Sequence, residues 1–546
     1  MYNPQRSAML AHYSHLRTTR RALLQRTSGR IHAKGRLMIK NLFATHPIKA
    51  MPHVDAGEPV EGSAEGEVTL KRVLTARHLV MLGVGAVIGA GIFAITGTAA
   101  AQFAGPALIL SFLIAAVACG LAGMCYAEFA AMLPVSGSAY SYSYATLGEV
   151  VAWFVGWALV LEYLFAASTV AVAWSGYFGE LLRMLSSMTG LNFTLPAALS
   201  SAPLTFAEGG HTLVTTGALI NLPAIIIVGA ISWLCYMGIT QSATVNAIIV
   251  AIKVSVILLF LIVMFNYINP DLWHPFIPAN EGGSKFGWSG IYRGATLVFF
   301  AYIGFDAVST AAGEAKNPQR DMPIGILGSL LLCTVLYVAM AAVMTGTTPF
   351  RMLNTPEPVA TAINYVLGTV AAGSPSSYIL GALKILVVFA ALAGLSSVIL
   401  VMLMGQPRIF YSMSRDGLLP QALGRLHTKH RTPYVGTIMV GVIASILAGL
   451  FPVDVLGDLV SMGTLLAFAT VCIGVLVLRR TRPELPRAFR VPVPWLVCPL
   501  GAAACLFLFW QAFEVRWPLL VSWIVIGFLI YGFYGYRHSK LRQGAR

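Results

Sequence analysis

One lysine of this chain lies inside an apolar stretch, where a charged group is costly. Lys253 follows six apolar residues, Ala247 to Ile252. Counted from Ser242 at about 1.5 Å per helical residue, it lies about 16 Å deep, near the midplane of a bilayer. Insertion there costs at least about 2.5–3.5 kcal/mol. Because burial favours the neutral form of a lysine, this side chain could take up and release a proton. A structural cation paired with an acid is the alternative.

Two acids lie in comparable apolar surroundings. Glu162 stands between Leu161 and Tyr163, and it could contact a substrate, pair with a lysine or stay protonated as a structural acid. Asp306 follows two residues after Gly304 in another apolar stretch. Its carboxylate could accept N–H bonds at the start of a half-helix, or pair with a neighbouring polar side chain. Both acids are therefore candidates for a substrate or proton role.

Glycines crowd the first apolar stretch. Glycine weakens a helix interior, so the cluster needs an explanation. One explanation is close helix packing through small residues. The other is a helix broken near Val87–Gly91, which frees backbone N–H and C=O groups and is tolerated at membrane depth only where it lines a cavity. The glycines are Gly83, Gly85, Gly89 and Gly91.

The Gly-Phe-Asp stretch at 304–306 predicts a second interrupted helix, five predicted helices after the first. This arrangement is typical of two inverted five-helix repeats with a binding site at the midplane. N–H groups at the start of a half-helix attract a carboxylate, and carbonyls at the end of a half-helix attract an ammonium group. An amino acid zwitterion satisfies both sets of groups, so we expect an amino acid substrate.

The elements that position these residues are membrane-spanning helices. Of 546 residues, 57% are hydrophobic and 10% are charged, against about 25% charged residues in soluble domains. Soluble domains are thereby excluded, and we expect an all-α polytopic membrane protein in a lipid bilayer. Twelve apolar runs are long enough to cross about 30 Å of hydrocarbon: 78–101, 106–133, 149–178, 219–237, 242–268, 290–313, 323–348, 378–406, 434–451, 455–478, 495–514 and 517–537.

The net charge of +15 follows the expected topology of the chain. Of the 36 lysines and arginines, 29 fall in segments that would be cytoplasmic if both termini are cytoplasmic, and five fall outside. This asymmetry obeys the positive-inside rule, so no nucleic-acid partner is needed to explain the charge. We expect a multi-pass protein of the bacterial inner (plasma) membrane.

The predicted spans divide the chain. Residues 1–77 form a basic cytoplasmic tail; residues 1–37 are disordered, a mitochondrial presequence or not native, since Met38 offers an internal start. Because the tail has no long apolar run, it is not a secretory signal. A transport core at 78–478 is followed by a basic loop at 479–494, two further helices at 495–537 and a cytoplasmic tail at 538–546. All seven cysteines lie in apolar stretches, so we expect neither disulfides nor a metal site.

Four sequence motifs make the chain similar to one known family. Taken together, and in this order, they resemble the amino acid–polyamine–organocation superfamily of permeases, in particular the cationic amino acid transporter branch and its bacterial members. The similarity runs from about residue 38 to the end. The motifs are Gly85–Phe93, Leu133–Tyr140 with the tyrosine-rich loop after it, Phe300–Asp306 running into Glu314–Pro318, and Gly405–Gly417.

The resemblance implies an inverted-repeat core of five plus five helices and two additional helices. It implies that the substrate carboxylate meets N–H groups near Ala90, Gly91 and Ile92, with Gly89 in the same site. The α-amino group would meet carbonyl groups. A lysine on the fifth helix replaces a sodium ion in several relatives, and Lys253 matches it, which favours a proton as the coupling ion without another cofactor. Glu162 matches an acid on the third helix of this branch. The expected carbonyls are those of Val87, Phe300, Ala301 and Ile303.

The substrate side chain is expected to contact the eighth helix. The segment 393–397 resembles the family's pocket lining, and its Leu395 is bulky and apolar. This favours small and neutral amino acids, whereas the name of the branch favours arginine and lysine. We therefore predict a proton-coupled symporter of L-amino acids, with an exchanger or facilitator for cationic amino acids as the alternative. A membrane-embedded enzyme and a receptor rank below both. A small accessory membrane subunit cannot be inferred from sequence.

Overall fold

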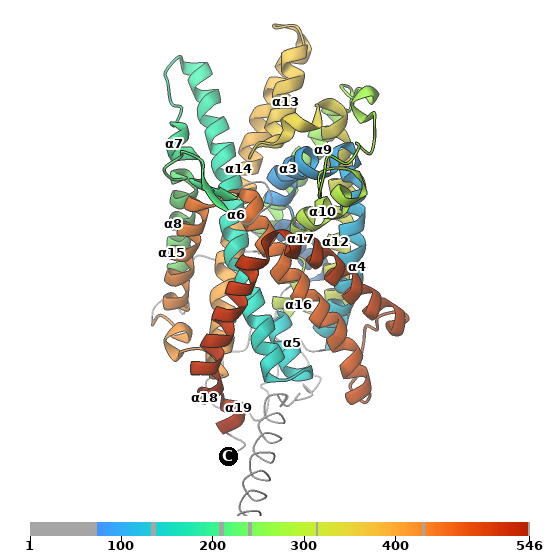
Figure 1. The fold of residues 1–546 in the computed structure, drawn as a ribbon, viewed down its shortest axis with the longest axis vertical. Coiled ribbons are helices and arrows are strands. Elements are labelled where there is room, and N and C mark those ends of the chain that lie inside the picture. The colour runs from blue at the N-terminus through green and yellow to red at the C-terminus, as the bar shows by residue number, and fades with distance from the viewer. Residues whose placement is uncertain are drawn as a thin grey trace, which may run out of the picture.

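The computed structural model consists almost entirely of helices, with one short β-hairpin (Figure 1). The N-terminal tail up to residue 73, including Met38, and parts of the 133–140 motif lie outside the described residues, as do Glu314 and the last three residues. The structure describes residues 74–132, 138–206, 212–238, 243–312, 315–428 and 432–543.

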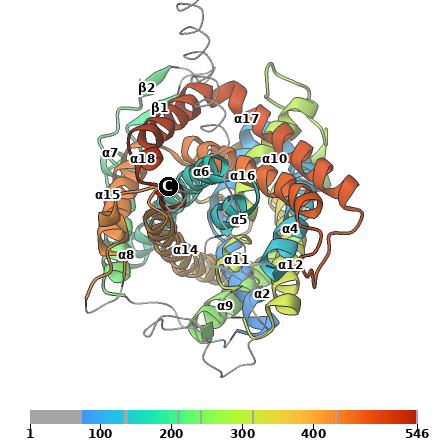
Figure 2. The same cartoon turned by 90° about the horizontal axis from the view of Figure 1, so that it is seen from below.

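In the part of the chain that the structure describes, eight helical segments are long and apolar enough to cross a membrane, so the chain is a polytopic membrane protein. Two further apolar helices are shorter, α8 (Leu222–Tyr236) and α15 (Tyr434–Leu450), and they lie side by side at one edge of the bundle (Figures 1 and 2). The eight segments are Ala76–Met132, Glu149–Thr189, Val245–Phe265, Gly287–Ser309, Pro318–Thr347, Pro375–Arg415, Val453–Thr481 and Pro494–Gln543.

Two of these segments contain more than one predicted span. The first reverses direction near Gly105, which has φ +58°, a conformation that glycine adopts at little cost. It contains α2 (Ala76–Val87) and α4 (Leu108–Met132). The last contains α17 (Pro494–Ile530), which kinks at Arg516, where φ is −122° and ψ is 17°. Both divisions lie where the sequence separates two apolar runs.

The first helix has the break that its glycines predict. After α2, Ile88 is extended, with ψ 93°, and a π-helical turn begins at Gly91. The glycines also serve close packing, because Gly85 faces Val250 and Gly89 faces Val398. Both explanations of the glycine cluster therefore hold. The chain continues through π-helical Gly91–Ile95, α3 (Thr96–Ala99) and π-helical Ala100–Ala104.

The second break lies against the first. Helix α10 (Gly287–Phe299) continues into a 3₁₀ turn at Phe300–Tyr302, and the next helix, α11 (Ala307–Thr310), is one turn long. Between them Gly304 has φ +118°, and a Cβ there would lie 2.9 Å from the carbonyl carbon of Ala86. Only glycine tolerates both conditions, so this residue lets the two broken backbones approach each other.

Several elements differ from the prediction. The long helices α6 (Glu149–Thr189) and α14 (Pro375–Arg415) extend past the predicted ends, and at 41 residues each measures about 60 Å. The tyrosine-rich segment predicted as a loop is helix α5 (Ser138–Thr146). Helix α13 (Pro358–Thr369) and the hairpin of β1 (Leu204–Phe206) with β2 (Leu213–Thr215) were not predicted, because a search for long apolar runs does not detect short amphipathic segments.

The remaining helices complete the bundle. Helix α12 packs against α2 and α4, while α16 packs against α6 and α17. The C-terminal helices lie at the same end of the molecule as α5 and the last turns of α14 (Figure 1). The bounds are α7 (Ala197–Ser200), α9 (Ala243–Phe265), α12 (Pro318–Thr347), α16 (Val453–Thr481), α18 (Tyr536–His538) and α19 (Lys540–Gln543).

Candidate substrate and coupling site

Lys253 of α9 reaches the end of α2, where the first helix breaks. Its Nζ donates hydrogen bonds of 3.0 Å to the carbonyl oxygens of both Gly85 and Ile88. The side chain is 1% exposed. The carbonyl end of a helix carries partial negative charge and attracts a cation, so the lysine occupies a position suited to a positive charge. No carboxylate of the described residues forms an ion pair with it.

The stem of Lys253 is held by α14. A Cβ added to Gly394 would lie 2.9 Å from Cε of the lysine, so the glycine makes room for the side chain. Lys253, on α9, therefore contacts two other helices, α2 and α14. A group in that position can respond to relative movement of these helices.

A tyrosine joins the two breaks. The hydroxyl of Tyr337, from α12, lies 2.8 Å from the carbonyl oxygen of Val87 and 2.9 Å from that of Ala301. These are two of the carbonyls expected to bind the substrate α-amino group. A hydroxyl has one proton to donate, so it is shared between them. Nothing in the local sequence identifies Tyr337, because its contacts depend on how α12 packs.

A small apolar cavity lies between the breaks, α6 and α14. At about 10 Å³ it has room for at most one water molecule, so this conformation is closed around the site. Its side chains carry no charge. It is lined by Ala86, Val87, Gly89, Ala90, Gly91, Ala166, Val170, Phe300, Ile303, Val398 and Met402.

The structure brings six of the nine expected substrate residues to this cavity and places the other three nearby. Ile92 and Ala301 are buried on the two breaks, and Leu395 is buried on α14. The side chains that α14 directs to the cavity are Val398 and Met402 instead of Leu395. They lie one and two helical turns further along the same face. The six lining residues are Val87, Gly89, Ala90, Gly91, Phe300 and Ile303.

Asp306 belongs to the second break but does not cap α11. Its carboxylate accepts a bond from the N–H of Gly304 at 3.3 Å and one from the hydroxyl of Tyr163 at 3.4 Å. The expected half-helix is only one turn long, and the side chain turns back to the loop before it. Asp306 does not line the small cavity.

Glu162 on α6 is 1% exposed, and neither of its carboxylate oxygens has a hydrogen-bond partner among the described residues. No ion pair with a lysine is present there in the part of the chain that the structure describes. A buried polar group without a partner is costly. The side chain does not line the small cavity, so in this conformation it is available to a group that enters from elsewhere.

A buried ion-pair network joins α10, α16 and α17. Both oxygens of Asp458, on α16, accept bonds from Nη2 of Arg293, at 2.7 and 2.6 Å. Arg516, at the kink of α17, lies 3.3 Å from the same carboxylate. In the sequence these side chains are recognisable only as charges near the ends of apolar runs. Their pairing depends on the tertiary fold.

The sequence of this chain is similar to those of known transporters. The amino acid permease family is matched over residues 74–531. The chain is 44% identical over 481 residues to the branched-chain amino acid permease BcaP of Bacillus subtilis. The aligned region covers 88% of this chain and 97% of that protein. It is also 44% identical over 475 residues to the methylthioribose transporter of Bacillus subtilis, over 87% and 96% of the two chains.

A plant relative is similar over a shorter region. The vacuolar cationic amino acid transporter 2 of Arabidopsis thaliana is 38% identical over 427 residues, which is 78% of this chain and 62% of that protein. The family, the apolar helices and the two facing breaks agree with one another. The chain therefore belongs to the amino acid permease family of the amino acid–polyamine–organocation superfamily, and it is a membrane transporter rather than an enzyme.

Proposed function

We propose that this permease carries L-amino acids together with protons, by alternating access across the bacterial plasma membrane. The observation that carries the proposal is the pair of 3.0 Å bonds from Lys253 Nζ to Gly85 and Ile88. They place a titratable cation on the backbone of the first break. We propose no other cofactor: the family resemblance implies that Lys253 supplies the charge that a sodium ion supplies in other transporters of this fold.

The coupling follows from the shared backbone. The carbonyl of Ile88 accepts from Lys253, and that of its neighbour Val87 is proposed to accept from the substrate ammonium group. The carboxylate is proposed to meet N–H groups of Ala90, Gly91 and Ile92. When Lys253 loses its proton, the positive charge at the end of α2 disappears and the contact between α2 and α9 weakens. The proton and the substrate thus both shift the conformational equilibrium of the first break, as coupling requires.

The substrate side chain is proposed to be small or branched and neutral. Val170, Ile303, Val398 and Met402 line the cavity, and an unpaired cation there would be desolvated without compensation. The printed names of the relatives include branched-chain and cationic amino acids, and the apolar lining favours the former. Leu395 is buried on α14, one helical turn from Val398.

The second candidate is an exchanger or facilitator for cationic amino acids. Glu162 is the observation that favours it, because its carboxylate oxygens have no hydrogen-bond partner among the described residues and could receive a cationic side chain in another conformation. Asp306 is held by Gly304 and Tyr163 and is less available. A proton role for either acid is compatible with the first candidate.

The architecture that we propose has twelve crossings. Two inverted repeats of five helices would fill 78–478, and two further helices 495–537, joined by the basic loop at 479–494. Support comes from the facing breaks in α2 and α10 and from the divisions at Gly105 and Arg516. The distribution of lysine and arginine supports cytoplasmic termini, at 1–77 and 538–546.

Uptake into proteoliposomes tests the proposal. The purified protein is reconstituted without sodium, and uptake of alanine, leucine and arginine is measured with and without an inward proton gradient. Accumulation of the neutral amino acids only with the gradient is expected. Uptake that ignores the gradient, is stimulated by internal amino acid and prefers arginine would establish the exchanger instead.

A further inference from the structure

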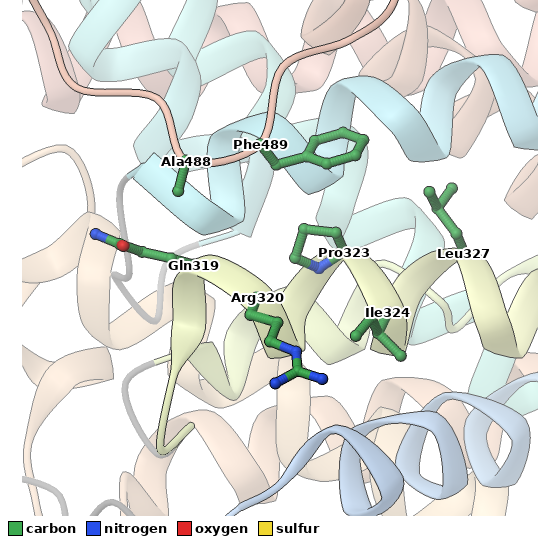
Figure 3. Close-up of a pocket in the computed structure, with 7 residues that line it drawn as sticks. All are labelled: Gln319, Arg320, Pro323, Ile324, Leu327, Ala488 and Phe489. Carbon is green, nitrogen blue, oxygen red and sulfur yellow. The ribbon is translucent and has the colours of Figure 1, made fainter.

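A groove lies away from the proposed substrate site, between the start of α12 and the loop that joins α16 to α17. Its volume is about 640 Å³, within the range of about 300–1,000 Å³ typical of small-molecule sites. Figure 3 shows Ala488 and Phe489 on the loop, facing the first turns of α12. The lining residues are Gln319, Arg320, Pro323, Ile324, Leu327, Ala488 and Phe489.

The groove is polar at one end and apolar along the rest of its length. Gln319 and Arg320 lie at the first turn of α12, while Leu327 lies two turns further along, at the other end of the row of side chains (Figure 3). The ring of Phe489 covers the middle from the loop side. A ligand that fits this pattern has a charged head and a hydrocarbon tail.

The apolar end is continuous with a face of α12 that none of the described residues covers. Ile324 is 43% exposed, Leu331 69% and Val335 59%. These residues are spaced so that they lie on one side of the helix, and α12 is long and apolar enough to span the membrane. In a bilayer this face contacts lipid chains, so a chain can pass from the bilayer into the groove without crossing polar surface.

The polar end of the groove carries the positive charge of Arg320. Arg320 lines this end and is exposed, and no carboxylate of the described residues forms an ion pair with it. The nearest acid in sequence, Asp321, is buried and accepts the N–H of Asn317 instead. Glu484, on the loop that joins α16 to α17, is exposed. The balance at this end favours an anionic head group.

The loop that forms one wall is firmly held. Both oxygens of Glu128, on α4, accept bonds from Arg479, at 2.9 and 2.5 Å, and one of them accepts the N–H of Val491 at 2.8 Å. The loop next to Phe489 is thus tied to α4 and α16. The groove has two walls fixed by the fold, as a binding site requires.

We propose that this groove binds an anionic phospholipid of the cytoplasmic leaflet. Its phosphate lies at Arg320, and one acyl chain follows Ile324 towards Leu331. Basic sites at the cytoplasmic surface attract such head groups. The lipid joins α12 to the loop before α17, and α12 packs against the broken helix α2. The inference rests on the orientation proposed above, but on neither the substrate nor the coupling ion.

Lipid binding to the full-length protein in detergent tests the proposal. Phosphatidylglycerol and phosphatidylcholine with identical acyl chains are titrated, and bound lipid is counted by native mass spectrometry alongside thermal unfolding. Phosphatidylglycerol is expected to bind more tightly and to raise the unfolding temperature further. Arg320→Gln should weaken phosphatidylglycerol about fivefold, from about 1 kcal/mol per basic residue, and Ile324→Trp should reduce binding of both lipids by filling the groove.

The matched control is Arg537→Gln, an exposed arginine outside the groove near the C-terminus, which should leave phosphatidylglycerol binding unchanged. Equal affinity for the two lipids, or equal losses in Arg320→Gln and Arg537→Gln, overturns the proposal. Stabilisation of the same size by glycerol 3-phosphate would also overturn it, because that result identifies a site for a free anion. Amino acid binding measured on the same samples separates failure of this inference from failure of the transport assignment.

Discussion

Gly91 packs directly against Ala301 of the second break, and Gly91→Ala tests whether that close approach matters. A Cβ at this residue would overlap both Cα and Cβ of Ala301, well inside the 3.0 Å that real Cβ atoms essentially never cross. Because the obstructing atoms include backbone, no side-chain rotation relieves the overlap. The breaks must separate, at a cost of about 1–3 kcal/mol for overpacking.

The effect on binding follows from the proposed site. The N–H groups beside Gly91 are proposed to hold the substrate carboxylate, and a hydrogen bond to a charged group contributes about 1.5–3 kcal/mol. Displacing one such bond should weaken alanine or leucine binding about 10- to 100-fold. The affinity is measured on purified protein by calorimetry or by ligand-induced thermal shift.

The matched control is Gly120→Ala on α4, where an added Cβ meets nothing within 4 Å. This variant should bind as the wild type does and should unfold at the same or a higher temperature, because alanine favours a helix interior. Unchanged affinity in Gly91→Ala, or equal losses in both variants, would refute the reasoning.

Three further predictions follow from buried polar contacts. Asp458→Asn leaves the guanidinium of Arg293 buried without its counter-ion and should lower stability by about 3–5 kcal/mol, measured by unfolding in detergent; adding Arg293→Met should restore most of the loss. Burial raises the pKa of Glu357, and Arg183 beside it lowers that pKa in part. The fold therefore favours the protonated carboxyl, so the stability that Glu357 contributes is present at low pH and is lost as pH rises through the folded pKa. Glu357→Gln should remove this pH-dependent loss of stability. The measurement compares the unfolding temperatures of the two proteins at about pH 4 and about pH 7. Tyr337→Phe removes the donor shared by carbonyls of both breaks and should cost about 1–3 kcal/mol, and unchanged thermal stability would show that water replaces the hydroxyl.

The membrane helices could be predicted from sequence because hydrocarbon imposes a length and a composition on every crossing. Helix α13 could not, because it is short and amphipathic and carries no such constraint. The glycines predicted the break in the first helix, since a break at membrane depth is tolerated only under special conditions. The ends of α6 and α14 were predicted too short, because their last turns extend beyond the apolar run.

The partners of the break were beyond sequence reasoning. Tyr337 is 250 residues away from Val87, and its hydroxyl reaches the carbonyl only through the packing of α12 on α2. Leu395 was expected in the pocket, but Val398 and Met402 line it. The three residues lie on one face of α14, so which of them reaches the cavity depends on how far along the helix the cavity lies, and the sequence pattern does not determine that position.

Lys253 was recognisable from depth alone, whereas its bonds to Gly85 and Ile88 required the tertiary structure. Charge at midplane depth marks a functional residue, but the partner can be an acid, a substrate or the backbone. The structure selects the backbone at the end of a broken helix. The absence of a paired acid among the described residues is the reason why we propose a proton, rather than a fixed ion pair, for this site.

Proton movement that accompanies substrate movement can be measured directly in proteoliposomes with a pH-sensitive dye inside and no sodium. Addition of external alanine should acidify the interior with the wild type and with Lys540→Met, whose side chain is exposed near the C-terminus. Lys253→Met should abolish acidification while counterflow exchange of alanine continues. Acidification that persists in Lys253→Met, or alanine uptake by the wild type without any proton movement, would contradict coupling through this lysine.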